Sequence, residues 1–328
     1  MRTTVLTALT ALTALTALTV TDAGAQSVTG KSGKWQAELR WRPRQDGSRL
    51  LWIMFEGRNN RHDDGGDFGF SLKVNELSGL TANDSRWSGP ANFEFRRDAG
   101  IIRFNGRFEE GWGEGTYRFE GDRRFLKALD LAHVEDIDED ELFAMAIHDV
   151  RTDWVRSLQQ AGVNDIDAGE LLAMQIHGVT PEFVRELKGL GYTNLPADKL
   201  IALRVHGATP EYVRDMKARG VVLPDLDDLI SFRVHNVSPG FIKEIGALGY
   251  DHVDPDDLVA MKIHGVTPQF IQSMVDVGLK NIDIDELVAF RIHGVDEDFI
   301  RDAVKRGVDL DPDDLVQYRI QGRRRHKP

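Results

Sequence analysis

The sequence predicts an α+β multidomain protein, in which a small antiparallel β sandwich or barrel is followed by an α-solenoid of 29-residue helical hairpin repeats. Three observations predict this fold class. A histidine recurs every 29 residues from His148 to His293, apolar residues recur at helical spacing between these histidines, and the preceding stretch alternates apolar with polar side chains. A fixed period of this length is typical of repeat proteins, in which each unit buries its apolar face against its neighbours.

Residues 1–25 have the pattern of a secretory signal peptide. Arg2 gives a positive start, residues 3–20 form an apolar Thr-Ala-Leu run, and Ala23-Gly24-Ala25 supplies a cleavage site. A membrane anchor is the alternative, but the many threonines and the lack of a basic flank after the run disfavour it. We therefore expect an exported protein, periplasmic or extracellular, with no membrane span in the mature chain. The sequence contains no cysteine, which excludes disulfides and a lipidated cysteine.

Residues 30–125 are expected to form the β-rich domain. The segments 35–41 and 102–108 alternate apolar with polar residues, as half-buried strands do. Further strands are expected at 49–56, 68–76, 92–97 and 116–120, separated by turns rich in Gly and Asp. Six or so strands with short turns indicate a small antiparallel sandwich or barrel.

Five of the six tryptophans lie in this domain. Trp35, Trp41 and Trp52 fall within expected strands, and we interpret them as core residues. Trp87 and Trp112 fall in expected loops, where a large ring is a candidate contact residue for a glycan or a peptide. Loop 58–67 is dense in Asp and contains His62. Metal binding there is an alternative, but the pattern favours a solvated loop, so no metal site is assigned.

A linker is expected at residues 126–137, followed by the repeat array at 138–322. An Asp stands ten residues before most of the repeat histidines and is expected to cap the first helix of its hairpin. Apolar residues then recur three apart, as in Leu200 and Leu203, and Gly or Asn ends the helix. A second helix begins with Thr-Pro or Ser-Pro in most copies, carries an aromatic residue, and ends at a Gly. The array should therefore contain seven first helices and six second helices.

The histidine row has several interpretations. Each His falls in the last turn of a first helix, where a donor meets unpaired carbonyl groups, so a structural role is favoured. A pH-sensing row is an alternative, since histidine titrates near pH 6. Metal sharing is disfavoured because equivalent side chains in packed repeats lie about 10 Å apart. The Asp-rich links lack the central Gly and distant Glu of a calcium-binding EF-hand loop. We therefore assign no metal and no cofactor.

The charge is unevenly divided between the two regions. Residues 27–125 hold 17 basic and 15 acidic residues, whereas residues 126–322 hold 19 basic and 37 acidic ones. An array with this acidic excess repels phosphate backbones, so nucleic acid is excluded as a partner. The tail at 323–328 is basic. A line of basic residues crosses the array and is the candidate contact row: Arg204, Arg233, Lys262, Arg291 and Arg319. A solvated helix face is the simpler interpretation of that line.

No catalytic residue is assigned, because the sequence contains no H-E-x-x-H, G-x-S-x-G or phosphate-loop motif. We expect a non-enzymatic binding, scaffold or sensory module that contacts a protein or a cell-envelope component through its array and its β-domain. The alternative is an envelope carbohydrate-binding protein or enzyme with its site in the β-domain. The oligomeric state and the identity of the partner stay open.

The repeat text Ile176-His177-Gly178-Val179-Thr180-Pro181-Glu182-Phe183-Val184-Arg185, with Leu190-Gly191-Tyr192 behind it, resembles the tandem helical segments that trail some membrane-embedded M56 metallopeptidases of bacteria and related exported proteins. The stretch from Arg97 to Phe119 resembles segments beside those repeats. The peptidase zinc motif and its membrane helices are absent from this sequence, so no catalytic residue carries over. The resemblance implies an accessory or sensory extracytoplasmic module.

Overall fold

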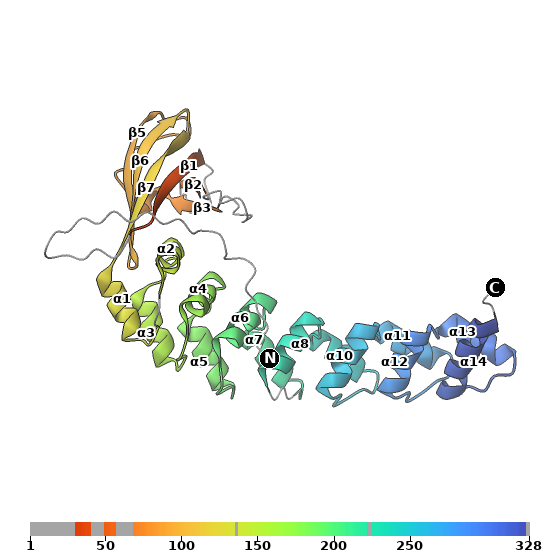
Figure 1. Cartoon of the computed structure of the whole chain (residues 1–328). Helices are drawn as coiled ribbons and strands as arrows, with labels where there is room; N and C mark the ends of the chain where they lie inside the picture. Colours follow the sequence, from red (N-terminus) through yellow and green to blue (C-terminus); the bar gives the residue numbers. More distant parts are fainter. Residues whose placement is uncertain (1–29, 41–48, 57–67, 135–136, 222–224, 326–328) are drawn as a thin grey trace. The chain divides into compact units, whose positions relative to one another are not determined.

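The computed structural model describes residues 30–40, 49–56, 68–134, 137–221 and 225–325 (Figure 1). Within these ranges a seven-stranded antiparallel sheet is followed by fourteen helices, which confirms an α+β protein with a β-domain ahead of a helical region. The chain divides into two compact units, Met1–Ile176 and His177–Pro328. The expected signal peptide and the 58–67 loop lie outside the described residues.

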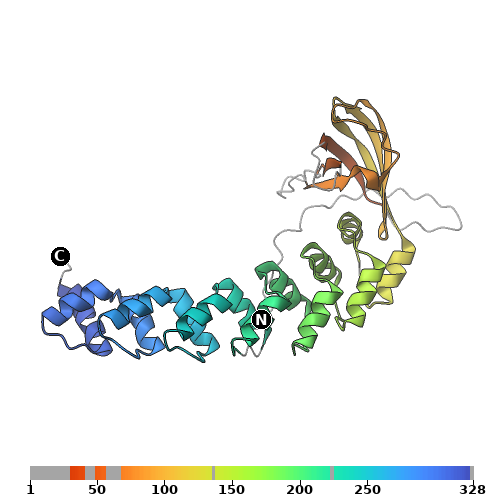
Figure 2. The same ribbon diagram turned by 180° about the vertical axis from the view of Figure 1, so that it is seen from behind.

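The β-domain consists of one curled sheet. Its strands are β1 (Ser32–Arg40), β2 (Leu50–Phe55), β3 (Phe68–Lys73), β4 (Leu77–Ser78), β5 (Gly89–Arg97), β6 (Gly100–Glu109) and β7 (Trp112–Gly121), with a short 3-10 turn, η1 (Val74–Glu76), before β4. The order across the sheet is β3-β2-β1-β7-β6-β5-β4, and all neighbours are antiparallel. Because β1 pairs with both β2 and β7, the described strands form a single curled sheet, a half-barrel (Figure 2). The antiparallel β-domain is confirmed, and its form is a half-barrel where the sequence predicted a small sandwich or barrel.

Aromatic side chains fill the inside of the half-barrel. Trp35 is fully buried, and its ring meets Phe93 and Phe104 edge-on, at centroid distances of 5.7 and 6.0 Å. Its indole nitrogen donates to the carbonyl oxygen of Thr116 at 3.1 Å, which satisfies the one polar atom of the ring. The core role predicted for Trp35 is confirmed. Trp52 is only half-buried, and the Arg40 guanidinium lies over its ring, 4.7 Å from the ring centre. Trp41 lies outside the described residues.

Helix α1 (Arg123–Asp130) extends into the segment 126–137, which was predicted to be a linker. Its N-cap Asp122 follows β7 directly and accepts a hydrogen bond from the backbone amide of Arg124. Phe125 and Leu129 are buried, and His133 has a left-handed φ of 55°. These three residues stand 29 positions before Trp154, Leu158 and Gly162, so α1 is a further second helix of the repeat. Its His in place of the terminal Gly, and its lack of a Thr-Pro start, hid it in the sequence.

The first unit also contains α2 (Glu139–Ile147), α3 (Thr152–Gln160) and α4 (Ala168–Ile176). Asp138 caps α2 as predicted: its carboxylate accepts from the Glu141 amide at 2.8 Å, and the Glu141 carboxylate accepts from the Asp138 amide at 3.0 Å. This reciprocal pair satisfies two amides that have no partner within the helix.

The second unit continues the alternation of first and second helices. Its elements are α5 (Pro181–Gly189), α6 (Ala197–His206), α7 (Pro210–Lys217), α8 (Leu226–Val234), α9 (Pro239–Gly246), α10 (Pro255–His264), α11 (Pro268–Asp276), α12 (Ile284–His293), α13 (Glu297–Lys305) and α14 (Pro312–Arg325). The hydroxyls of Thr180, Thr209, Ser238 and Thr267 cap the second helices, each accepting from the amide of the aromatic residue three positions on. The predicted capping chemistry is confirmed at these four starts.

Within the second unit, helices of the same kind pack against one another. The first helices α6, α8, α10, α12 and α14 form one series of contacts, and the second helices α5, α7, α9 and α11 form another (Figure 1). The repeated leucine of the first helices is fully buried at every position of this unit: Leu200, Leu229, Leu258, Leu287 and Leu315. Each repeat therefore contributes the same residue to a core shared with its neighbours.

Candidate interaction surface

The half-barrel is joined to the first described hairpin through Phe143 of α2. The Phe143 ring stacks on Tyr117 with centroids 5.6 Å apart, and it meets Phe55 and Phe119 edge-on at 5.3 Å each. Phe143 and Ile147 are 5% and 9% exposed. Helix α2 is thus buried on two sides, because Leu142 and Met145 face the helical core while Phe143 fills the sheet. A helix that is apolar all round is normally buried in this way.

Polar contacts surround this aromatic cluster. Lys31, just before β1, pairs with Asp140 in the first turn of α2 and also lies over the Phe143 ring, 5.4 Å from its centre. Arg97 Nε lies 2.9 Å from Asp149 Oδ1, and the Thr152 amide donates to Asp98 Oδ2 at 3.0 Å. The β-domain and the first hairpins therefore form one compact unit held by specific side chains.

The predicted basic row joins consecutive repeats. Arg204, Arg233, Arg291 and Arg319 each donate from Nε to the backbone oxygen of the histidine in the preceding repeat, at 3.3, 3.1, 3.3 and 3.4 Å respectively. All five cations, Lys262 included, lie 4.6 to 5.3 Å from the centre of the aromatic ring in the preceding second helix. These contacts give the row a structural role, and contact with a partner stays a prediction.

The guanidinium groups of Arg204, Arg233 and Arg291 lie close to the glycine that ends the preceding first helix. Gly207 has a left-handed φ of 69°, and a Cβ placed on it would lie 3.1 Å from a guanidinium nitrogen of Arg233. Where the equivalent residue is Asp149 or Asn236, the residue 26 positions on is Gln175 or Lys262, which have no guanidinium. Gln175 instead donates to the backbone oxygens of His148 and Asp149, at 3.1 and 3.2 Å. The residue that follows the repeat histidine therefore varies together with the residue that reaches it from the next repeat. Glycine occurs with arginine, and Asp or Asn occurs with Gln or Lys.

The histidine side chains differ in their surroundings although their spacing is constant. His177, His206 and His264 are exposed, whereas His148 is half-buried, and this burial lowers its pKa. The backbone oxygens of the row have a more regular role: those of His148, His177, His206, His264 and His293 each accept a hydrogen bond from a side chain of the next repeat. In the described ranges, no group of three or more His, Asp and Glu side chains is arranged to hold a metal ion.

The first helices carry a second row of apolar residues that is exposed. Val205, Val234, Ile263 and Ile292 of α6, α8, α10 and α12 are 54, 47, 55 and 52% exposed. Their neighbours one helical turn earlier are half-buried: Ile201, Ile230, Val259 and Val288. We call these eight residues the outer face. With α4's Ile176, this one repeat position holds half of the ten large apolar side chains that are exposed in the described part of the chain.

The outer face was not singled out from the sequence, although its signal is present. The residue before each repeat histidine is Ile or Val in every copy. With about 100° of rotation per residue, Val205 lies about 170° around the helix from the middle of the Leu200–Leu203 pair. A β-branched apolar residue that lies opposite the core in every repeat forms an exposed apolar row. A helical projection of one repeat is sufficient to find it.

Comparisons with known proteins do not assign this surface. Neither a protein-family model nor a curated protein matches the chain. The resemblance to the helical segments of M56 metallopeptidases therefore stays a prediction. In the described ranges, no helix has the length and apolar character needed to cross a membrane.

The two candidate tryptophans have different environments. Trp87 lies in the loop before β5, where it is half-buried, and its ring centre is 5.7 Å from that of Phe108. Trp112 is the first residue of β7, so its predicted loop position is wrong, and its side chain is 63% exposed. The Gly111 amide donates to the Trp87 carbonyl oxygen at 3.0 Å, which brings the two segments together. Of the two rings, Trp112 is the one available to a ligand.

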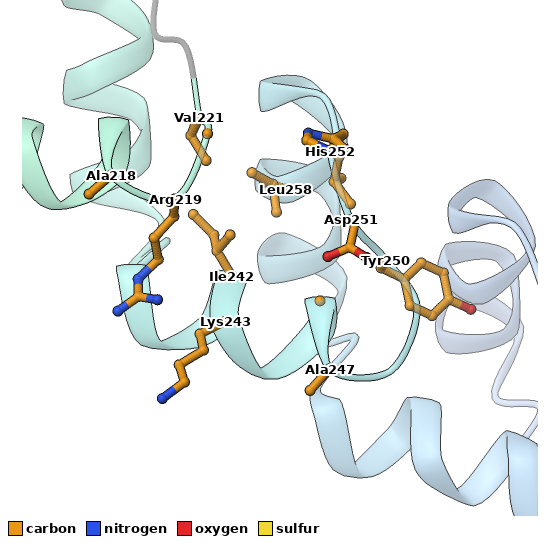
Figure 3. A pocket seen from close by; sticks show the side chains of 13 residues that line it. Ala218, Arg219, Val221, Ile242, Lys243, Ala247, Tyr250, Asp251, His252 and Leu258 are labelled. Carbon is orange, nitrogen blue, oxygen red and sulfur yellow. The ribbon is translucent and has the colours of Figure 1, made fainter.

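A pocket of about 320 Å³ lies in the second unit, between the ends of α7 and α9 and the start of α10 (Figure 3). Arg219 and Lys243 extend to one side of it, and Asp251 is its one carboxylate. Tyr250 points away, and its hydroxyl donates to the backbone oxygen of Ile282 at 2.7 Å. The lining therefore offers no pair of carboxylates for acid–base chemistry.

Proposed function

We propose that this protein is an exported, non-enzymatic binding protein of the bacterial cell envelope. In this proposal the hairpins form an α-solenoid that presents a surface to a partner protein or an envelope component. The observation that carries it is the outer face, where β-branched residues opposite the core are exposed at the same position of successive repeats. Large apolar side chains that are exposed together on one surface are characteristic of interaction sites.

A further observation supports a repeat scaffold. The same hydrogen bond, from an arginine to the histidine oxygen 27 residues earlier, recurs at Arg204, Arg233 and Arg291. When the same contact recurs between successive repeats, the repeats form a regular array. Such arrays use their extended faces for binding. Export rests on the signal-peptide pattern of residues 1–25. An accessory or sensory role beside a membrane protein rests on the resemblance to M56-associated repeats.

Site-specific photo-crosslinking tests the binding function. A photoreactive amino acid replaces Val205 or Ile263 on the outer face, and Lys305 of α13 serves as the exposed control position. The mature protein carrying each replacement is irradiated in envelope extract. We expect a discrete cross-linked species from positions 205 and 263 and none from position 305. Absence of any species specific to the outer face would remove the support for this function.

Carbohydrate binding in the β-domain is the second candidate, and the 63% exposure of Trp112 is the observation that favours it. An exposed tryptophan ring offers a flat apolar face, and its fluorescence responds to a bound sugar. Co-sedimentation with insoluble cell-wall glycan, compared between the native protein and Trp112→Ala, tests this candidate. Equal amounts in the pellet would argue against a site at Trp112.

A further inference from the structure

The residues of the outer face have equivalents at the same repeat positions of helix α2, and there the structure shows them covered. Phe143 and Ile147 of α2 hold the same repeat positions as Ile201 and Val205 of α6. Both are buried, and the Phe143 ring packs against the half-barrel. In α4 the equivalent residues are Leu172, which is buried, and Ile176, which is 45% exposed. The chain thus covers this face at its first copy and leaves the later copies exposed.

The covered copy shows which chemistry fits the face. Its occupant presents aromatic rings two residues apart on a strand, Tyr117 and Phe119, together with a basic side chain, Lys31. Lys31 contacts both the acidic residue of the first helical turn, Asp140, and the Phe143 ring. The contact combines apolar burial with an ion pair at a helix N-terminus.

The later copies repeat both parts of this pattern. Asp198, Asp227, Asp256 and Asp285 stand at the position of Asp140, and all four are exposed. Each lies seven residues before the exposed Val or Ile, on the same side of its helix. Among these four, Asp227 pairs with Lys199 of the preceding first helix.

The charge of this region argues against a second copy as the occupant. Residues 126–322 hold 37 acidic and 19 basic residues, so two such faces brought together would repel. A partner with basic residues interspersed among apolar ones is complementary to both the aspartates and the β-branched side chains.

We propose that the outer face of α6, α8, α10 and α12, with its four aspartates, binds a cationic amphipathic polypeptide segment of another protein. The segment carries apolar side chains that cover Val205, Val234, Ile263 and Ile292, and Lys or Arg side chains that pair with Asp198, Asp256 and Asp285. This inference rests on the proposed binding function and names the chemistry of the partner.

The test uses three synthetic peptides and the mature protein. One peptide alternates Phe with Lys, the second alternates Phe with Glu, and the third alternates Ser with Lys. The outer-face variant carries Val205→Thr, Val234→Thr and Ile263→Thr, which keep the branching at Cβ and the net charge. The matched control carries Leu131→Thr, Val275→Thr and Val304→Thr, which remove three exposed apolar residues elsewhere. Circular dichroism confirms that both variants remain folded.

We expect the Phe–Lys peptide to bind the native protein and the control equally, and to bind the outer-face variant about tenfold or more weakly. The triple variant Asp198→Asn, Asp256→Asn, Asp285→Asn should also bind less and lose part of the salt dependence. Equal binding of the Phe–Lys and Ser–Lys peptides, or of the outer-face and control variants, would overturn the proposal.

Two other outcomes separate this inference from the function on which it rests. If position 205 cross-links to an envelope component while the Phe–Lys peptide does not bind, the binding function stands and the proposed partner chemistry is wrong. If sedimentation shows that the native protein self-associates and the outer-face variant does not, the occupant is a second copy, and the proposal is likewise overturned.

Discussion

The Nε atom of Arg233 lies 3.1 Å from the backbone oxygen of His206, the last residue of helix α6. Carbonyl groups at the end of a helix have no partner within it, and they form the negative end of the helix dipole. The guanidinium also covers the Tyr212 ring, with 4.9 Å between the cation and the ring centre. One side chain therefore caps a helix and packs on an aromatic residue of the preceding repeat.

Removing this cation should weaken the contact between repeats. Arg233→Met keeps a long apolar side chain but loses both the hydrogen bond and the cation–π contact. We expect the free energy of unfolding to fall by about 1–2 kcal/mol. Urea denaturation followed by circular dichroism measures the change.

Lys262→Met is the matched control for this prediction, because Lys262 lies over the Phe241 ring at 4.9 Å and is the one member of the row other than arginine. Its loss should be smaller, about 0.5–1 kcal/mol. Equal losses at the two positions would mean that the arginine hydrogen bond contributes nothing.

The pairing of glycine with arginine makes a second prediction. Gly207→Asn introduces a residue type that already occurs in the left-handed conformation elsewhere in this chain, at Asn236, where φ is 57°. Its Cβ meets the Arg233 guanidinium, so we expect a loss of about 1 kcal/mol. In the background of Arg233→Lys the same substitution should cost less, giving a coupling of about 0.5 kcal/mol or more in a double-mutant cycle.

Gly307→Asn is the control for the backbone conformation alone. Gly307 has a φ of 85°, and a Cβ at this position would have no neighbouring atom within 4 Å. It should show no coupling to Arg233→Lys. If Gly207→Asn also shows none, the guanidinium does not select glycine at this helix end.

Local signals in the sequence are sufficient to predict the helical hairpins. The capping aspartates, the Thr-Pro starts and the buried leucines act within one repeat, and the structure has them at the expected positions. Helix α1 escapes prediction because its local signals are weak: His133 replaces the usual glycine, and Asp122 replaces Thr-Pro. Its membership is shown by packing, since Phe125 and Leu129 are buried like Phe183 and Leu187 at the same positions of α5.

Contacts between distant segments are not predictable in this way. The alternation in residues 30–125 indicates strands, but the pairing of β1 with β7 decides between a half-barrel and a sandwich, and no local pattern specifies it. In the sequence Phe143 is one more apolar residue of a helix, although it fills the half-barrel. The arginine row is visible in the sequence as a row, but its partners are backbone oxygens 26 or 27 residues away.

Phe143 should carry much of the contact between the sheet and the helices. Phe143→Ala removes a buried ring that touches Phe55, Tyr117 and Phe119, and we expect a loss of about 3–5 kcal/mol. Ile201→Ala, at the equivalent position in α6, should cost much less because Ile201 is half-buried. Tryptophan fluorescence, to which the buried Trp35 contributes, and urea denaturation report the two changes. A similar loss at both sites would show that the contacts of Phe143 with the half-barrel add no stability beyond that of a half-buried apolar residue.

His148 should make stability depend on pH. Burial lowers its pKa below the ordinary value of 6.5, so the folded protein binds this proton less readily than the unfolded chain does. The contribution is therefore fully present above pH 6.5 and is lost as the pH falls from 6.5 through the folded pKa, because protonation favours the unfolded state. His148→Gln should lose less stability than the native protein between pH 7.5 and pH 5.5 in urea denaturation. His177→Gln, at an exposed position of the same row, is the control for the substitution itself. If instead the His177 variant flattens the pH profile and the His148 variant does not, exposure along the row, and not burial at its first member, sets the response of the array to acid.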